Sequence, residues 1–347
     1  MKKHLIAAAV ATAFAVPAMA QNVTISGYAE LGYNRLATDN AATATTIAKG
    51  IFGSSRVVIG GSEDLGGGLK AGFRLEADLD PTSGKLGKNA PTSTTQDTIF
   101  SRGAEVNLSG GFGMIRLGKF DHQGGENTDG TTSNIAGNIA LATGIASADT
   151  GNGTAEGVEI GSDRDGTMAY RTPSFLGGYV EVAHTPSDAI TATNSGDGVQ
   201  GAVTSVYYEG TPVPGLSVRA GYATQKAVGA QTTSNKDADR TGLGASYNFG
   251  MFEAGIHYAS ATLISQSKIA ETTVAAKMPL GNGLDIRAVY QDYDVSGTAT
   301  GDFRETSVAL AKSLSKRTNV FAAYQTVNYG DATADTSRVY FGVGHSF

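Results

Sequence analysis

Alternation of apolar and polar residues with a period of two runs through most of this chain, and it constrains the fold more than any other feature. In residues 69–80 every second side chain, from Leu69 to Leu79, is apolar, and the residues between them are charged or glycine. Successive side chains of a β-strand point to opposite faces of the sheet. The pattern recurs in residues 216–225 and 284–291, whereas the helical period of 3.6 is hard to find. The sequence therefore predicts an all-β fold.

The first 20 residues differ from the rest and indicate export. Two lysines precede an uncharged apolar run over residues 5–16, and the small-x-small pattern of a signal-peptidase site ends at Ala20. The apolar run is too short to form a stable transmembrane helix. We expect a signal peptide over residues 1–20, cleavage between Ala20 and Gln21, and one mature domain over residues 21–347.

The composition of the exported part leaves two classes of protein. Removing 20 residues from 347 leaves 327, and the loss of two lysines takes the formal charge from −6 to −8. The absence of cysteine excludes disulfides and thiolate metal sites. Charged residues make up only 17%, below the usual quarter of a soluble domain, and glycine is abundant at 47 residues. A soluble β-rich periplasmic protein and an outer-membrane β-barrel both fit these totals.

The lengths of the connections favour the barrel. Short turns rich in glycine, proline and asparagine occur at residues 63–68, 109–113, 173–178, 211–215, 250–252, 279–283 and 314–318. Mostly longer polar connections separate them, at residues 36–54, 81–97, 121–163, 187–199, 227–239, 263–268, 296–302 and 330–336. Seven short and eight other connections join 16 antiparallel strands, and outer-membrane barrels alternate tight periplasmic turns with larger external loops in this way. Counts of 14 and 18 strands stay open, because strand boundaries inferred from sequence carry an error of a few residues.

The two ends of the chain should close the barrel. Lipid cannot hydrogen-bond an open strand edge, so the first strand, near residues 23–34, must pair with the last, over residues 337–347. The last strand alternates through Val339, Phe341 and Val343 and ends at Phe347. A terminal phenylalanine on an outward-facing strand resembles the signal that the barrel assembly machinery reads.

Four blocks of sequence, spread over the mature chain, carry a family resemblance. They read SSRVVIGGSEDLGGGLKAGFRLE at residues 54–76, SRGAEVNLSGGFGMIRLGKF at residues 101–120, RDGTMAYRTPSFLGG at residues 164–178, and GHSF at the end. Together they resemble the general diffusion porins of the neisserial and betaproteobacterial type. The resemblance implies a 16-stranded barrel in the outer membrane of a Gram-negative bacterium, a homotrimer in contact with lipid and lipopolysaccharide, and a third external loop folded into the lumen.

The resemblance also implies a pore constriction, in which arginines on the barrel wall face acidic residues of the third loop. By position, the wall residues are Arg56, Arg102, Arg164 and the carboxylate Glu76. Arg74 is inward by its own alternation. The third loop would span residues 121–163, and its acidic candidates are Asp121, Glu126 and Asp129.

Two positions depart from the pattern of the family. The third loop begins KFDHQGGENTDG and lacks the usual Pro-Glu-Phe-Gly-Gly start. Glu105 takes a position where we expect an outward apolar residue. Because a charge exposed to lipid is costly, this predicts a subunit interface or a bulge at Glu105.

Arginines opposite carboxylates create a transverse field, which lets polar solutes pass and disfavours apolar ones. We therefore expect passive diffusion of small hydrophilic solutes and ions. We also expect a modest preference for anions. Positive charge at the narrowest point should govern the ion preference although the mature chain is formally −8, because charges on outer loops are screened within about 10 Å. The alternative is a substrate-specific channel whose third loop forms a dedicated binding site, with a short helix over residues 135–146.

Enzymatic and cofactor functions find little support in the sequence. Residues 113–119 satisfy most of a P-loop pattern, but Phe120 replaces the required Ser/Thr and no helix follows. Residues 149–165 lack the spacing of a calcium loop. The four histidines of the mature chain have no HExxH spacing, which counts against hydrolase chemistry; they are His122, His184, His257 and His345. A barrel hydrolase stays only as a further alternative. We expect no enzyme activity, cofactor or metal site, and no nucleic-acid partner because no basic cluster is present.

Overall fold

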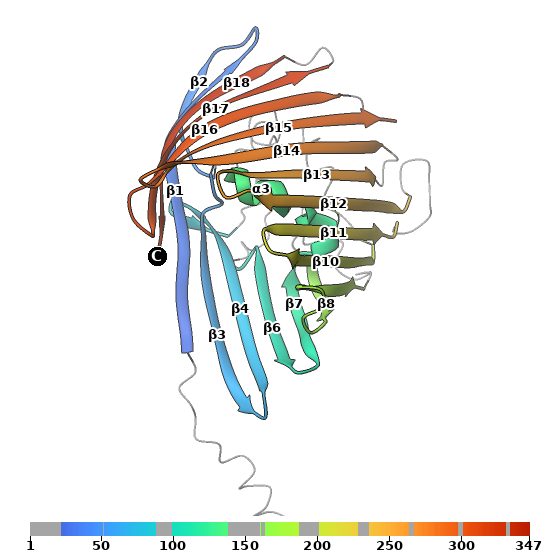
Figure 1. Ribbon diagram of the computed structural model, residues 1–347. Helices are drawn as coiled ribbons and strands as arrows, with labels where there is room; N and C mark the ends of the chain where they lie inside the picture. Colours follow the sequence, from blue (N-terminus) through green and yellow to red (C-terminus); the bar gives the residue numbers. More distant parts are fainter. Residues whose placement is uncertain are drawn as a thin grey trace, which may run out of the picture.

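The computed structural model describes residues 22–50, 52–87, 99–137, 160, 164–186, 201–227, 236–263, 267–297, 301–330 and 334–347. Nearly all of these residues belong to one antiparallel sheet that closes on itself as a barrel (Figure 1). Among them, no helix is long and apolar enough to cross a bilayer. The expected signal peptide and its cleavage site at Ala20 and Gln21 lie outside the described residues.

Sixteen strands form the wall of the barrel, as the sequence predicted. They are β1 (Asn22–Thr38), β3 (Arg56–Gly66), β4 (Leu69–Asp80), β6 (Gly103–Gly110), β7 (Gly113–Phe120), β8 (Arg164–Arg171), β9 (Gly178–Thr185), β10 (Val203–Val213), β11 (Leu216–Gln225), β12 (Ala238–Asn248), β13 (Glu253–Thr262), β14 (Lys268–Gly281), β15 (Leu284–Ser296), β16 (Phe303–Ser313), β17 (Thr318–Tyr329) and β18 (Thr336–Ser346). Two short strands are added to this wall, β2 (Ala44–Ala48) and β5 (Lys85–Leu86).

The predicted closure between the first and last strands is confirmed. Residues 28–38 of β1 pair with residues 346–336 of β18. Beyond this ladder, Gly27 and Phe347 exchange two backbone hydrogen bonds, with N···O distances of 3.0 and 3.1 Å. No strand edge is left open at the seam, which is the condition for a sheet in hydrocarbon.

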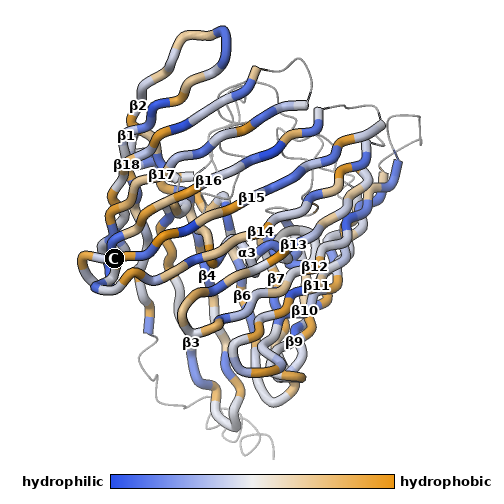
Figure 2. Tube along the Cα trace, turned by 45° about the horizontal axis from the view of Figure 1, so that its top comes forward, coloured by the Kyte–Doolittle hydropathy of each residue, from blue (hydrophilic) through white to orange (hydrophobic). Residues whose placement is uncertain are grey.

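The two faces of the wall follow the alternation of the sequence, and Figure 2 shows polar and apolar residues alternating along the strands. Phe73 on β4 lies opposite Val106 on β6, and both point outward. Arg74 lies opposite Glu105, and both point inward. The expectation of an outward Glu105 is therefore wrong. Val106 and Leu108 are exposed on the outward face of β6, so alternation within the strand places Glu105 in the lumen.

One predicted connection is also wrong, because residues 36–54 are not one external loop. β1 continues to Thr38, and β2 pairs with it over Leu36 to Gly32. The turn between these strands takes only residues 39–43. The sequence of β2, ATTIA, has no polar–apolar alternation, which is why periodicity missed it. Between β2 and β3 the chain leaves the wall.

The third loop enters the lumen in its described part. After β7 it forms α2 (Gln123–Glu126), the 3-10 turn η1 (Asn127–Asp129) and α3 (Gly130–Ala136). These elements contact β10 to β15 and lie inside the barrel (Figure 1). The helix begins before the predicted span of residues 135–146, and residues 138–146 lie outside the described part of the chain.

The position of Phe347 generates a prediction about assembly. Its side chain is exposed on the outward face, in line with Phe341 and Val343, so it is available to a receptor before the seam closes. Deleting Phe347 should lower the yield of inserted barrel without reducing export to the periplasm, as measured by fractionation. Phe347→Tyr, which keeps an aromatic ring, is the matched control and should insert normally. A deletion variant with wild-type yield would contradict the role of Phe347.

Candidate pore constriction

Three arginines on one wall of the lumen converge on a single carboxylate. Arg56 Nη1 lies 3.1 Å and Arg102 Nε lies 3.0 Å from the same oxygen, Oε1 of Glu76. Arg74 forms an ion pair with the other oxygen, and Arg102 Nη1 also reaches Asp78 Oδ1 at 3.2 Å. We call Arg56, Arg74 and Arg102 the wall arginines. The structure thus brings together four of the residues predicted from the sequence.

The register of β3 and β4 places these groups side by side. Directly opposed residues of antiparallel strands share a face. Arg56 lies opposite Asp78, and Arg74 lies opposite Gly60. Glu76 lies opposite Gly103 on the other neighbour, β6, and Arg102 reaches back over it from just outside that strand.

Burial differs sharply between the two kinds of charge. The Glu76 side chain is 3% exposed, whereas those of Arg56, Arg74 and Arg102 are 35%, 48% and 28% exposed. The carboxylate therefore lies behind the guanidinium groups, which meet the water of the lumen. Hydrogen bonds to a buried carboxylate hold arginine side chains in place more firmly than exposed pairs do. The lumen surface here is cationic although the cluster contains carboxylates.

A second charged row, which the sequence analysis missed, continues along the same wall. Arg116 Nε donates to Glu105 Oε2 at 3.0 Å, and Arg116 Nη1 lies 3.1 Å from Glu181 Oε2. Glu181 Oε2 also accepts a hydrogen bond from Arg171 Nη2 at 2.8 Å. The guanidinium of Arg171 stacks over Tyr179, with its Cζ 4.0 Å from the ring centroid. The signal was available, because each of these charges has the inward parity of its strand.

The third loop is attached to β9, β10, β12 and β13 by buried hydrogen bonds. His122 Nε2 lies 2.7 Å from Thr185 Oγ1, and its Nδ1 lies 3.0 Å from Ser205 Oγ. Further along, the hydroxyl of Thr128 lies 3.0 Å from His257 Nε2 and accepts from Arg240 Nη1 at 3.0 Å. Two of the four histidines therefore hold the loop. The other two, His184 and His345, bond to threonines on the outward face.

Four inward-facing glycines on β11, β12 and β13 make the close approach of the loop possible. A Cβ atom at Gly221 would lie 2.7 Å from Gly124 Cα, and one at Gly244 would lie 2.7 Å from the carbonyl oxygen of Thr128. Real Cβ atoms do not approach this closely, so a larger residue would displace the loop. We call this set the glycine row; it comprises Gly221, Gly242, Gly244 and Gly255.

The three acidic residues predicted for the loop differ in how far the structure describes their surroundings. Asp129 precedes α3 and lies close to the inner surface of β11 to β14; burial raises the pKa of its carboxyl, and nearby His257 and arginines partly offset that rise. The backbone oxygen of Asp121 accepts a hydrogen bond from Gln123. The side chains of Glu126 and Arg164 lie outside the described part of the structure, although Arg164 begins β8. No group of three or more potential metal ligands occurs among the described residues.

A closed barrel with an apolar exterior, a charged lumen and a loop folded inside defines an outer-membrane channel. Residues 7–332 match the family described as Gram-negative porin, and the chain belongs to this family. It is an outer-membrane porin of Gram-negative type, and its relatives are channels rather than enzymes.

Similar proteins support both the family and the fold. Outer membrane porin protein 32 of Delftia acidovorans is 29% identical over 350 residues, which cover 96% of this chain and 91% of that protein. The solved structure of an anion-selective porin from Comamonas acidovorans matches with a TM-score of 0.73 at 23% identity, covering 94% of this chain and 100% of the other. The trimer form of OmpT from Vibrio cholerae matches with a TM-score of 0.60 at 15% identity, covering 94% and 99%.

The glycine row gives a direct test of how the loop is held. In Gly221→Ala the new methyl group meets the backbone of Gly124, so we expect a loss of about 1–3 kcal/mol in stability and a larger single-channel conductance as the loop moves off the wall. Thermal unfolding and planar-bilayer recording measure these effects. Gly60→Ala is the matched control, because its nearest neighbour would be at an ordinary 3.5 Å. Wild-type values for both variants would show that the row does not hold the loop.

Proposed function

We propose that this porin is a passive channel for small hydrophilic solutes and ions, whose constriction lies between the wall arginines and the third loop. The observation that carries the proposal is the buried Glu76 behind three partly exposed guanidinium groups. The attachment of α2 and α3 to β10 to β15, across the lumen from β3, β4 and β6, supports it. By sequence position, the proposed set also includes Arg164, Asp121, Glu126 and Asp129.

The proposed selection is electrostatic. Cationic groups on one wall and carboxylates on the loop opposite produce a transverse field, in which polar solutes and ions keep favourable interactions after losing part of their hydration. Apolar solutes gain nothing from this field and must displace ordered water. The field therefore favours small hydrophilic solutes without a site specific to one of them.

We further propose a modest preference for anions. The wall cluster holds three arginines against Glu76 and Asp78, an excess of one positive charge, and its carboxylate is the buried partner. Charges on the outer loops act weakly on the constriction because salt screens them within about 10 Å. The Comamonas acidovorans structure, described as an anion-selective porin, is consistent with this proposal at the level of the shared fold.

Replacing Arg56 and Arg102 together by alanine tests the constriction. The variant should move the reversal potential in a salt gradient towards cations and raise the single-channel conductance, because two cationic side chains leave the lumen and Glu76 loses two partners. Arg304→Ala is the control; this arginine is paired with Asp292 and well exposed, and it points outward by the alternation of β16. Unchanged selectivity in the double variant would remove these arginines from the constriction while leaving the porin family intact.

We also propose that the protein works as a homotrimer of processed chains in the outer membrane. Support comes from the solved trimer form of a structurally similar protein and from the leader pattern that ends at Ala20. Assembly machinery, lipid and lipopolysaccharide are its proposed partners in the membrane. Native mass spectrometry in mild detergent should report three copies of a chain that begins at Gln21. A monomer, or a chain that retains residues 1–20, would contradict the corresponding part.

A further inference from the structure

A second part of the chain enters the lumen and meets the third loop. It lies between β2 and β3, and we call residues 52–55 the inward segment. Phe52 is buried, and its ring stacks on that of Phe321 from β17 with centroids 4.1 Å apart and planes 15° apart. The guanidinium of Arg287 lies 5.2 Å from the centre of the Phe52 ring. The aromatic side chain of Phe52, from the connection between β2 and β3, therefore lies inside the barrel.

The inward segment is held by one carboxylate of β1. Glu30 is fully buried, and its oxygens accept from the backbone N–H groups of Phe52 at 2.9 Å and Gly53 at 2.7 Å. The hydroxyls of Tyr28 and Tyr340 donate to the same carboxylate at 3.0 and 3.2 Å. Hydrogen bonds to an ionised acceptor are about twice as strong as neutral ones. Glu30 therefore fixes the backbone that carries Phe52.

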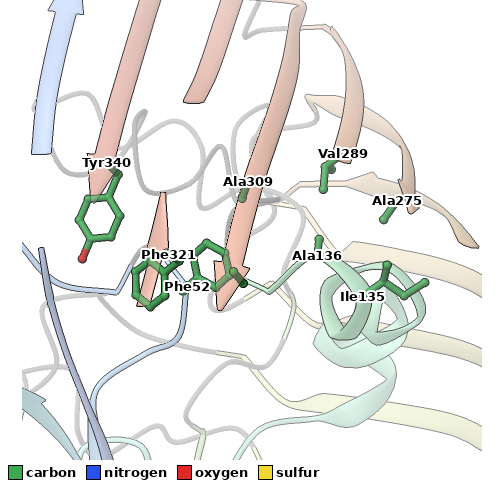
Figure 3. Close-up of a cluster of buried hydrophobic side chains, with 9 residues drawn as sticks. Phe52, Ile135, Ala136, Ala275, Val289, Ala309, Phe321 and Tyr340 are labelled. Carbon is green, nitrogen blue, oxygen red and sulfur yellow. The ribbon is translucent and has the colours of Figure 1, made fainter. Parts of the chain in front are cut away.

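Phe52 in turn contacts the end of α3. Ile135 and Ala136, the last residues of this helix, are fully buried in one cluster with Phe52, Phe321 and Tyr340, which Figure 3 shows. A Cβ atom at Gly137 would lie 3.1 Å from the carbonyl oxygen of Phe52. These apolar residues lie in a lumen lined with charges, and Phe52 joins them in one buried cluster. The start of α3 is attached at the glycine row, and its end is attached here.

We propose that Glu30 is a positioning residue for the channel: through the inward segment it fixes the C-terminal end of α3 and so the width of the lumen beside it. The inference rests on the proposed role of the third loop in the constriction. A helix attached at both ends holds a constant opening. Without the inward segment, the end of α3 keeps only its packing on β13 to β15. We expect that end to move more, so that the current through the open channel fluctuates.

Glu30→Gln tests this inference in the full-length protein. The amide group keeps the shape of the side chain but turns one acceptor into a donor, which opposes a backbone N–H. Hydrogen exchange should accelerate about tenfold at the amides of Phe52 and Gly53 and at the end of α3, including the Gly137 amide that bonds to Ser133. In planar bilayers the variant should show more open-channel noise and more frequent partial closures than the wild type.

Glu305→Gln is the matched control. Glu305 is also a fully buried carboxylate of the lumen, but its hydrogen bonds go to Ser307 and Gln325 on the wall. This variant makes the same Glu-to-Gln substitution in the lumen without touching the inward segment. We expect wild-type exchange in α3 and wild-type noise.

Phe52→Ala separates the binding of the inward segment by Glu30 from the contact of Phe52 with α3. It removes the ring but leaves the N–H groups that Glu30 binds, so the end of α3 should exchange faster while the amides of residues 52 and 53 stay slow. If both variants leave α3 exchange as in the wild type, the inward segment does not hold the helix and the inference is overturned. If α3 loosens but the current does not change, Glu30 still positions the helix, and the proposed constriction is what fails.

Discussion

The barrel depends on one constraint: in hydrocarbon, every backbone N–H and C=O must find a partner within the protein. The pairing of β1 with β18, completed by the two hydrogen bonds between Gly27 and Phe347, meets that condition. Closure also fixes the register of every strand. A shift of one residue in the register of β4 would point Arg74 and Glu76 towards lipid and their apolar neighbours towards the water of the lumen. The seam and the charged lumen therefore stabilise the same register.

With the faces fixed, the charged side chains of the lumen wall are satisfied largely by one another. Glu76 gathers Arg56, Arg74 and Arg102, and Glu181 joins Arg116 to Arg171. The buried partner is the carboxylate in both clusters, and most of the arginines remain partly exposed. A wall with nearly balanced formal charge thus presents guanidinium groups to a passing solute. Counting charges along the sequence does not reveal this difference between buried and exposed partners.

The interior of the barrel is shaped by where side chains are missing as much as by where they are present. The glycine row lets backbone of the third loop lie directly on β11 to β13, at distances that a Cβ atom would forbid. At the end of α3, Ile135 and Ala136 instead belong to one buried cluster with Phe52, which lies between β2 and β3, and with Phe321 of β17. Glycines therefore allow α3 to lie against the wall, and a cluster that contains Phe52 and Phe321 packs at its end.

The sequence by itself determined the all-β fold, the inward Arg74 and the outward Phe347, because a period of two is a local property that each strand carries in its own residues. The connection lengths favoured 16 wall strands but left 14 and 18 open. Family resemblance added Arg56, Arg102 and Glu76, which the folded chain brings together. Local periodicity failed at β2, where alanine and threonine give no alternation. The expectation of an outward residue at Glu105 was wrong because Val106 and Leu108 take the outward positions of β6. Only the tertiary structure decided that Glu30 binds Phe52 and that Thr128 meets His257. These contacts join segments 22 and 129 residues apart, and they exist only because closure of the barrel places unrelated stretches of chain around one small lumen.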